Sequence, residues 1–321
     1  MTGLAILCPG QGGQHHAMFD KLTGMSAAEE TLAQAAVVSG EDPRTWLRHA
    51  APEALFDNRV AQPLLCTAML ATWAVLRGQL PAPRVFAGYS VGELAAYGCV
   101  GALDVAETLR LAHARAACMD AASNTAAGLA AVRGLNRTRI DALCHEHGVQ
   151  IAIVNSPDHY VIGGAASGLD RLLAAARTQG APTARRLPVT VAAHTPGLCA
   201  ASAAFGEVLA HSALGMPAIP VLAGISGAPV GDRDTAIKML AAQLSTTVDW
   251  AACMQAAYEM GARVFLELGP GAALTHMLRE SHADVAARSV DEFRTLPGAC
   301  DWVEQQLTRI SGTTPSTAIR N

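Results

Sequence analysis

The sequence predicts a mixed α/β fold, with an α/β-hydrolase-like large domain built on a parallel sheet and an inserted ferredoxin-like small subdomain. Short apolar runs alternate with amphipathic helical patterns, as in α/β proteins. A glycine-flanked serine turn stands between a predicted strand and a predicted helix. The order of these patterns changes at about residue 128, which suggests an insertion. The chain has 321 residues, enough for two domains or for one domain with a large insertion.

The large domain is predicted to be discontinuous, formed by residues 1–127 and 191–321. Apolar runs typical of buried parallel strands occur at residues 4–7, 84–87, 219–223 and 264–268. Helical patterns between them cover residues 62–76, 91–98 and 104–119. In the first of these helices Pro63 is expected in the first turn, where its missing N–H costs little.

The small subdomain is predicted over residues 128–190. Strand patterns occur at residues 129–132, 149–154, 160–163 and 184–187, and helical patterns at 136–147 and 169–178. Asn136 is the expected N-cap of the first helix. The resulting order, βαββαβ, is that of a ferredoxin-like unit. The polar tail over 311–321 is expected to fray.

The composition excludes several classes of protein. With 51% hydrophobic, 16% charged and 4% aromatic residues and a net charge of −4, the chain is too apolar for disorder and lacks a basic surface for nucleic acid or anionic membranes. Eight cysteines without a C-x-x-C pair indicate buried thiols rather than disulfides or a zinc site. The N-terminus has no secretion signal, and the apolar stretch 64–76 is shorter than a membrane span. We therefore expect a cytoplasmic protein with no nucleic-acid or membrane partner.

The sequence Gly88-Tyr89-Ser90-Val91-Gly92 fits a nucleophile elbow. Such a turn exposes the serine hydroxyl, and its glycines remove side chains that would collide. The amide of Val91, at the start of the helix, is placed to donate to an oxyanion. An ordinary glycine-rich turn is the alternative, but the position between strand and helix favours a nucleophile.

A serine nucleophile needs a base. His194 lies where the predicted insertion rejoins the large domain, although by itself it is more typical of a structural histidine. His276 and His282 follow a Gly-Pro-Gly segment and are the late histidines that a hydrolase triad would use.

His145 and His147 flank Glu146 and raise the question of a metal site. Residues two apart on a helix do not share a face, so a solvated surface is the better interpretation. We predict no metal.

The motifs taken together resemble the malonyl-CoA:acyl-carrier-protein transacylases. The resemblance covers residues 1 to about 290 and is carried by motifs in the expected order. These are Cys8-Pro9-Gly10-Gln11-Gly12-Gly13-Gln14, Gly88-Tyr89-Ser90-Val91-Gly92-Glu93, Arg115 with Met119, Asn155-Ser156-Pro157, His194, the segment 243–250 and Gly269-Pro270-Gly271.

One position departs from the family pattern, because Tyr89 stands where the family usually has histidine. The segment GYSVGELAAYG is similar to that of the epsilon subunit of malonate decarboxylase, which loads malonyl onto the carrier protein of that enzyme. The resemblance therefore favours this subunit, with the transacylase of fatty-acid or polyketide synthesis as the alternative.

The resemblance implies a role for each motif residue. Ser90 is the nucleophile and His194 its base, a dyad in which a backbone carbonyl near Gln243 takes the place of the triad carboxylate. This arrangement is sound because a carbonyl that accepts from Nδ1–H fixes the imidazole tautomer. Gln11 and Val91 supply the backbone amides of the oxyanion hole.

Arg115 is implied to bind the malonyl carboxylate, which a guanidinium grips with two charge-assisted hydrogen bonds. Gln62 and Asn155 are implied as supporting residues. The expected reaction is a ping-pong transfer from malonyl-CoA to the phosphopantetheine-type thiol of an acyl carrier protein, with the CoA thioester as substrate and no bound cofactor. A serine esterase or thioesterase, and a non-catalytic subunit that docks carriers, remain the alternatives from other classes.

Overall fold

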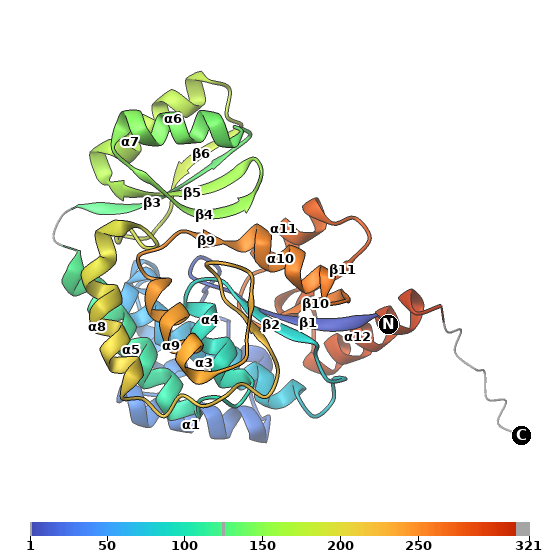
Figure 1. The fold of residues 1–321 in the computed structure, drawn as a ribbon. Helices are drawn as coiled ribbons and strands as arrows, with labels where there is room; N and C mark the ends of the chain where they lie inside the picture. The colour runs from blue at the N-terminus through green and yellow to red at the C-terminus, as the bar shows by residue number, and fades with distance from the viewer. Residues whose placement is uncertain (1, 124–125, 313–321) are drawn as a thin grey trace, which may run out of the picture.

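The computed structural model describes residues 2–123 and 126–312, and these form two sheets surrounded by helices (Figure 1). The predicted mixed α/β character is confirmed. The frayed tail predicted over 311–321 lies outside the described residues from 313 onward.

The larger sheet has six strands in the order β11-β10-β1-β2-β7-β8. All neighbours are parallel except β7 and β8, which are antiparallel. The strands are β1 (Gly3–Cys8), β2 (Val85–Gly88), β7 (Val221–Leu222), β8 (Pro229–Val230), β10 (Ala262–Glu267) and β11 (Ala286–Ser289). Every residue of β1 and β2 is buried, as the continuous apolar runs of a covered parallel sheet require.

Helices cover both faces of this sheet (Figure 1). The helices of this half of the molecule are α1 (Ser26–Ser39), α2 (Pro43–His49), α3 (Asn58–Leu76), α4 (Val91–Cys99), α5 (Val105–Ala122), α8 (Cys199–Ala210), α9 (Arg233–Ala242), α10 (Trp250–Glu259), α11 (Ala273–Ser281) and α12 (Leu296–Ile310). Helices α4, α10, α11 and α12 pack against its strands, and α1, α2, α8 and α9 pack mainly on other helices. Short 3₁₀ helices lie in the connections between these elements: η1 (Asp20–Leu22), η2 (Pro52–Phe56), η3 (Pro196–Leu198) and η4 (Val290–Glu292).

Helix α3 begins at Asn58, so the prediction that Pro63 lies in the first turn was wrong. Pro63 stands inside the helix, where it cannot donate to the preceding turn. Its own carbonyl accepts a hydrogen bond from the Thr67 hydroxyl at 2.8 Å. Every residue of α3 from Ala61 to Trp73 is buried, and this tertiary packing outweighs the local cost of the proline.

Helix α3 is also the one described helix long and apolar enough by composition to cross a membrane. Its most apolar window is 78% buried within the fold. It packs against α1, α4 and α5, so we interpret it as a core helix.

The smaller sheet has the strand order β6-β3-β5-β4-β9. Residues 127–186 follow the predicted βαββαβ order, and the N-cap at Asn136 is confirmed by its bond from the amide of Arg139. The elements are β3 (Ala127–Arg133), α6 (Arg137–His147), β4 (Gln150–Ser156), β5 (His159–Ala165), α7 (Ala166–Thr178) and β6 (Thr183–Arg186). A separate apolar core lies between this sheet and its two helices.

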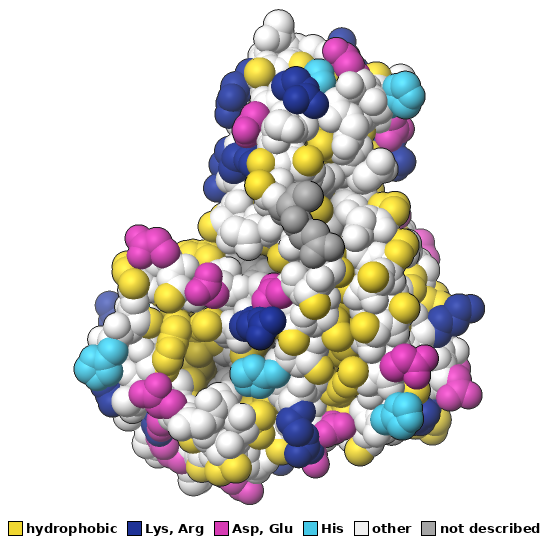
Figure 2. All heavy atoms as spheres, turned by 90° about the vertical axis from the view of Figure 1, so that its left-hand side faces the viewer, with side chains coloured by type: hydrophobic (Ala, Val, Ile, Leu, Met, Phe, Trp, Pro, Cys, Tyr) yellow, Lys and Arg dark blue, Asp and Glu magenta, His cyan; other side chains and the backbone are white. Residues whose placement is uncertain are grey.

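A fifth strand, β9 (Val248–Asp249), joins this sheet from far along the chain and pairs in parallel with β4. Helix α10 follows directly and contacts β4 of the smaller sheet as well as β2 and β10 of the larger one. The smaller sheet and its helices form a lobe above the main body, and charges of both signs are interspersed over the face seen in Figure 2. The carboxyl end of β2 therefore lies close to the junction of the two sheets.

Candidate active site

The predicted elbow is present between β2 and α4. Ser90 has φ 56° and ψ −119°, and Val91 begins the helix. A Cβ at Gly92 would lie 2.0 Å from the carbonyl oxygen of Cys8, so only glycine allows α4 to approach β1 this closely. The chain thus turns sharply enough to present the serine at the sheet edge.

Ser90 and His194 meet although they are 104 positions apart in sequence. The Oγ of Ser90 lies 2.8 Å from Nε2 of His194, and Nδ1 of His194 lies 2.6 Å from the backbone oxygen of Gln243. Because that carbonyl can only accept, Nδ1 carries the proton and Nε2 is free to accept from the serine hydroxyl. The geometry is that of a serine with a positioned neutral base.

Backbone strain marks the same two residues. Among the residues that the structure describes, Ser90 and His194 are the only non-glycine residues with positive φ, at 56° and 62°. The amide of His194 is held by the carbonyl of Leu244 at 2.9 Å. Strained φ values of this kind persist only where the surroundings enforce them, and they cluster at functional sites.

Burial keeps the imidazole neutral. His194 is 1% exposed. Desolvation, and then the charge of Arg115, lower its pKa to about 3, against a smaller opposing effect of the hydrogen bond to Gln243. A neutral imidazole at physiological pH is the form that can accept the serine proton.

Arg115 is buried and faces the serine. Helix α5, capped by the Asp104 side chain, carries it to a position where its Nη2 lies 3.4 Å from Ser90 Oγ. Its other contacts are to Gln62 Oε1 at 2.9 Å, Gln243 Oε1 at 2.9 Å and Met119 Sδ at 3.3 Å. Desolvation lowers the pKa of Arg115 to about 10, so it stays cationic at neutral pH. Gln62 therefore contacts Arg115 directly.

Gln243 hydrogen-bonds to Ser90, His194 and Arg115. Its backbone oxygen accepts from His194, its Oε1 accepts from Arg115, and its Nε2 donates to the backbone oxygen of Ser90 at 3.2 Å. The sequence implied only the carbonyl. The side chain adds a fixed link between the guanidinium and the elbow.

Asn155 lies on β4 and contacts the residue before the nucleophile. Its Oδ1 accepts from the Tyr89 hydroxyl at 3.0 Å, and the Tyr89 ring packs edge-on against Trp250 at 5.3 Å. Asn155 and Trp250 also line a groove of about 470 Å³ with Asp249, Met254 and Met277. Tyr89 thus joins the elbow to the smaller sheet and to this groove.

The loop that carries Gln11 packs against the elbow. A Cβ at Gly10 would lie 2.8 Å from the carbonyl oxygen of Tyr89 and 3.6 Å from Cβ of Ser90. A Cβ at Gly13 would lie 2.2 Å from the carbonyl oxygen of Pro270. The loop is therefore held between Ser90 and the Gly269–Gly271 turn. The other predicted oxyanion donor, the amide of Val91, is next to Ser90 in the sequence.

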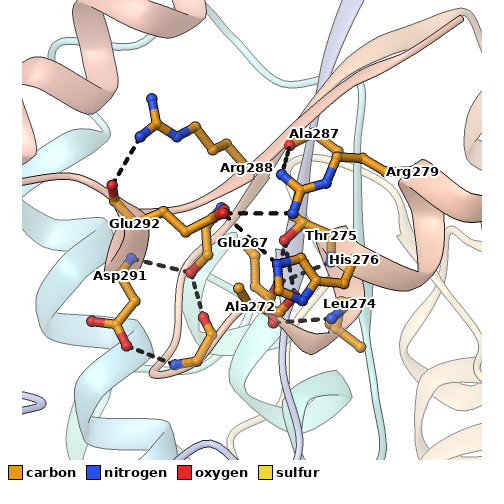
Figure 3. A network of polar contacts seen from close by, with 12 residues as sticks. Glu267, Ala272, Leu274, Thr275, His276, Arg279, Ala287, Arg288, Asp291 and Glu292 are labelled. Carbon is orange, nitrogen blue, oxygen red and sulfur yellow. Dashed lines mark hydrogen bonds and ion pairs between the residues drawn. The ribbon is translucent and has the colours of Figure 1, made fainter. Parts of the chain in front are cut away.

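A polar network fixes that turn at the ends of β10 and β11 (Figure 3). The carboxylate of Asp291 accepts from the amide of Gly271 at 2.9 Å, and the hydroxyl of Ser289 donates to the Gly271 carbonyl at 2.5 Å. Glu267 accepts from the amide of Thr275 at 3.0 Å. The Gly-Pro-Gly motif is thus a rigid support for the Gln11 loop.

The alternative histidines take no part in this geometry. His276 lies on α11 within the network of Figure 3, 3.8 Å from Glu292, with 61% of its side chain exposed. His282 lies at the end of the same helix, where its Nδ1 is 2.9 Å from Oγ of Ser281. Within residues 2–123 and 126–312, no group of three or more His, Cys, Asp or Glu side chains is arranged to hold a metal ion.

One residue of the site was missed at the sequence level. Glu93 is 0% exposed, and its Oε2 accepts from Gln243 Nε2 at 2.5 Å and from the amide of Gly224 at 2.9 Å. The available signal was a lone acidic residue in the otherwise apolar segment VGELAAYG. Burial raises the pKa of Glu93 to about 7.

Comparison with known proteins agrees with this geometry. The sequence model of the acyl transferase domain family matches residues 6–297. The malonyl CoA-acyl carrier protein transacylase of Escherichia coli is 30% identical over 308 residues, covering 94% of this chain and 100% of the relative. That of Mycobacterium tuberculosis is 29% identical over 294 residues, covering 89% and 96%.

Solved structures give the same result. The malonyl CoA-acyl carrier protein transacylase of Coxiella burnetii has a TM-score of 0.90 at 29% identity, covering 95% of this chain and 98% of that chain. A malonyl-transacylase in complex with a type II polyketide synthase acyl-carrier protein has a TM-score of 0.89 at 29% identity, covering 94% and 99%. The predicted family is therefore confirmed: this chain belongs to the malonyl-CoA:acyl-carrier-protein transacylases of the acyl transferase family.

Proposed function

We propose that this protein transfers a malonyl group from malonyl-CoA to the phosphopantetheine-type thiol of an acyl carrier protein through a malonyl-Ser90 intermediate. The observation that carries the proposal is convergence on one oxygen. Ser90 Oγ lies 2.8 Å from the base His194 and 3.4 Å from the buried cation Arg115. The relatives described above are named for the same transfer.

In the first half-reaction, Ser90 Oγ attacks the thioester carbon while its proton passes to His194 Nε2. The C–S bond then breaks, and CoA leaves as the thiol after His194 returns the proton. The Gln243 carbonyl holds Nδ1–H throughout and stabilises the imidazolium. The amides of Gln11 and Val91 are proposed to stabilise the oxyanion.

Arg115 is proposed to bind the malonyl carboxylate. Its present hydrogen-bond acceptors, on Gln62, Gln243, Ser90 and Met119, are all uncharged, so a substrate carboxylate would be a stronger partner. Pairing would also offset the positive charge that lowers the pKa of His194. A substrate with a carboxylate would thus strengthen the base that its own transfer requires.

In the second half-reaction, the carrier thiol loses its proton to His194 and attacks the malonyl-serine ester, which regenerates Ser90. We propose that the groove lined by Asn155 and Trp250 receives the thioester arm, because Tyr89 connects that groove to the nucleophile. Neither half-reaction changes an oxidation state, so the chemistry needs no redox cofactor.

The choice of carrier protein separates two versions of this function. The relatives described above favour the transacylase of fatty-acid or polyketide synthesis over the malonate decarboxylase subunit that the GYSVGELAAYG segment suggested. Tyr89 supports the decarboxylase version, since it replaces the usual histidine of the family and contacts the groove through Asn155.

The test uses the purified 321-residue chain, malonyl-CoA and two carrier proteins, one from fatty-acid synthesis and one from malonate decarboxylase. Mass spectrometry of each carrier measures malonyl transfer, and free malonate is measured in parallel. We expect rapid transfer to the fatty-acid carrier. Faster transfer to the decarboxylase carrier would reverse the choice between the two versions. Rapid malonate release with no transfer would instead indicate a thioesterase.

A further inference from the structure

The Glu93 side chain contacts Gln243 but none of the three proposed catalytic and substrate-binding groups, Ser90, His194 and Arg115, by a hydrogen bond. Glu93 stands on the first turn of α4, three residues after Ser90, and is completely buried. Its backbone amide donates to the Ser90 carbonyl oxygen at 3.0 Å as part of the helix start, but among the described residues its side chain makes no hydrogen bond to Ser90 or His194. Its contacts run instead through Gln243 and Gly224.

Gln243 is oriented by two opposite charges. Its Nε2 donates to the carboxylate of Glu93, and its Oε1 accepts from the guanidinium of Arg115. The reversed amide would place Oε1 against the carboxylate and NH₂ against the guanidinium, so both contacts would become repulsive. Glu93 therefore fixes the amide orientation that Arg115 needs.

The carboxyl of Glu93 has room for a proton. Both hydrogen bonds fall on Oε2, and Oε1 has no hydrogen-bond partner among the described residues. Protonation at Oε1 therefore leaves both bonds to Oε2 in place. The close approach of Gly224, where a Cβ would lie 2.8 Å from Oε2, keeps the carboxyl in this position.

The charge balance of the pocket changes when a carboxylate enters. In the free protein, Arg115 and Glu93 together are neutral, and a malonyl carboxylate beside Arg115 would leave one excess negative charge in a buried site. Burying an uncompensated charge is costly, and a titratable group neutralises instead. Glu93 is the buried carboxyl whose charge acts on Arg115.

The other titratable groups around Glu93 do not compete for this proton. Burial raises the pKa values of Tyr97 on α4 and Cys253 on α10, so both are already protonated at neutral pH. His194 has a pKa of about 3, lowered by burial and by Arg115. Arg115 on α5 remains cationic, with a pKa of about 10.

We propose that Glu93 is a proton-linked positioning residue, which orients Arg115 through Gln243 and takes up one proton when a substrate carboxylate pairs with Arg115. The inference rests on the proposed function, because it requires a substrate that carries a carboxylate. Burial, which raises the pKa of Glu93 to about 7, is consistent with proton uptake in the physiological range. Glu93 itself makes no contact with the reacting atoms.

The direct test measures protons taken up on binding. Ser90→Ala protein, which cannot be acylated, is titrated with malonyl-CoA at pH 8 by calorimetry in buffers of different ionisation enthalpy. The dependence of the observed heat on buffer gives the number of protons bound. At pH 8, one pH unit above its pKa, most Glu93 is ionised in the free protein and can take up a proton. We therefore expect uptake of about one proton with malonyl-CoA and none with acetyl-CoA. Equal uptake with both ligands would overturn the proposal.

Variants assign the proton to Glu93. In the Ser90→Ala background, Glu93→Gln keeps an oxygen for Gly224 and Gln243 but cannot titrate, so proton uptake should disappear. The matched control Glu280→Gln removes a half-exposed carboxylate on α11 and should keep it. Because binding takes up a proton, the Kd of Ser90→Ala protein for malonyl-CoA should rise by up to about tenfold between pH 7.5 and 8.5. The Kd of the protein that also carries Glu93→Gln should not change over this range. Uptake that persists in Glu93→Gln would contradict the assignment.

The positioning role has a separate readout. With Ser90 intact, Glu93→Ala removes the partner of Gln243 and should lower kcat, whereas Glu93→Gln should restore most of it. Equal kcat in these two variants would contradict positioning through Gln243. If wild-type protein forms no malonyl-Ser90, the proposed function fails. If it does, and proton uptake is the same for both CoA esters, only the role of Glu93 fails.

Discussion

At the scale of single residues, the site depends on the hydrogen bonds that Gln243 makes to His194 and Arg115. A buried histidine and a buried arginine each carry a desolvation cost, and here each lowers that cost through Gln243. Arg115 also disfavours the charged form of His194. Because the acceptors around Arg115 are all uncharged, we expect the substrate carboxylate to be its charged partner.

Arg115→Ala should lower kcat/KM for malonyl-CoA by about 10- to 150-fold, since a hydrogen bond to a charged group contributes about 1.5–3 kcal/mol. Acetyl-CoA, which lacks the carboxylate, should be affected far less. The matched control is Arg110→Ala, which removes an exposed arginine of the same helix paired with Glu107. Steady-state kinetics with both CoA esters measures the ratio. An equal loss for both esters would show that Arg115 does not select the carboxylate.

His194→Ala should lower the rate of Ser90 malonylation by about 10²–10⁴-fold, the usual contribution of a general base. His276→Ala should leave it unchanged, because His276 is exposed and pairs with Glu292. Rapid-quench measurement of CoA release in the first turnover distinguishes them. A larger loss in the His276 variant would support the esterase alternative.

At the scale of elements, one loop and two turns hold the backbone amides that we propose as oxyanion donors. The Gln11 loop is wedged between the elbow and the Gly269–Gly271 turn, and Asp291 anchors that turn by accepting from the Gly271 amide. Contacts this close are possible only because Gly10, Gly13 and Gly92 have no side chains.

Gly13→Ala should displace the Gln11 loop, since its Cβ would lie 2.2 Å from the carbonyl oxygen of Pro270. Loss of one oxyanion donor typically lowers kcat by about 10²–10³-fold, and we expect an effect of this order with a smaller change in KM. Gly78→Ala is the control, because its Cβ would meet nothing within 4 Å. A Gly13→Ala protein with normal kcat would show that the loop does not supply a donor.

Sequence patterns predicted β2, β4, α4 and α5, which position Ser90, Asn155 and Arg115, because each has a continuous apolar run or a helical period. The elbow pattern predicted Ser90, whereas His194 and Arg115 were predicted through the resemblance of the ordered motifs to the transacylase family. The start of α3 was misplaced because Pro63 is tolerated inside a helix that tertiary packing stabilises. Strand β9, with two residues, is too short to leave a pattern.

Glu93 could not be assigned from sequence for a related reason. Its partners Gly224 and Gln243 lie 131 and 150 positions away, so its role depends on contacts that local spacing does not encode. The oxyanion roles of Gln11 and Val91 remain predictions that the Gly13 variant tests.

At the scale of the whole molecule, Glu93 and Glu267 are both fully buried in the large-sheet half of the protein. Desolvation raises the pKa values of Glu93 and Glu267 to about 7 each. Glu267 ends β10 and accepts from the amides of Leu274 and Thr275 at the start of α11 (Figure 3). Because burial disfavours the ionised forms, we expect these carboxylates to orient their partners rather than to stabilise the fold.

Glu267→Gln should change the pH dependence of stability in a defined direction. A carboxyl with a folded pKa of about 7 and an ordinary unfolded pKa near 4.5 binds more protons when folded, so its contribution to the free energy of unfolding falls as pH rises from about 4.5 to above 7. The Tm of the variant relative to wild type should therefore rise from pH 5.5 to pH 8. Thermal unfolding at both pH values measures this difference, and a constant difference would contradict the role of burial.

The most direct test of the account is covalent. Wild-type protein is mixed with malonyl-CoA without a carrier, quenched in acid, digested and analysed by mass spectrometry. We predict one malonyl group on the peptide that contains Ser90, its removal when a carrier thiol is added, and its absence in Ser90→Ala protein. A malonyl group on another residue, or full transfer activity in the Ser90→Ala variant, would contradict the account.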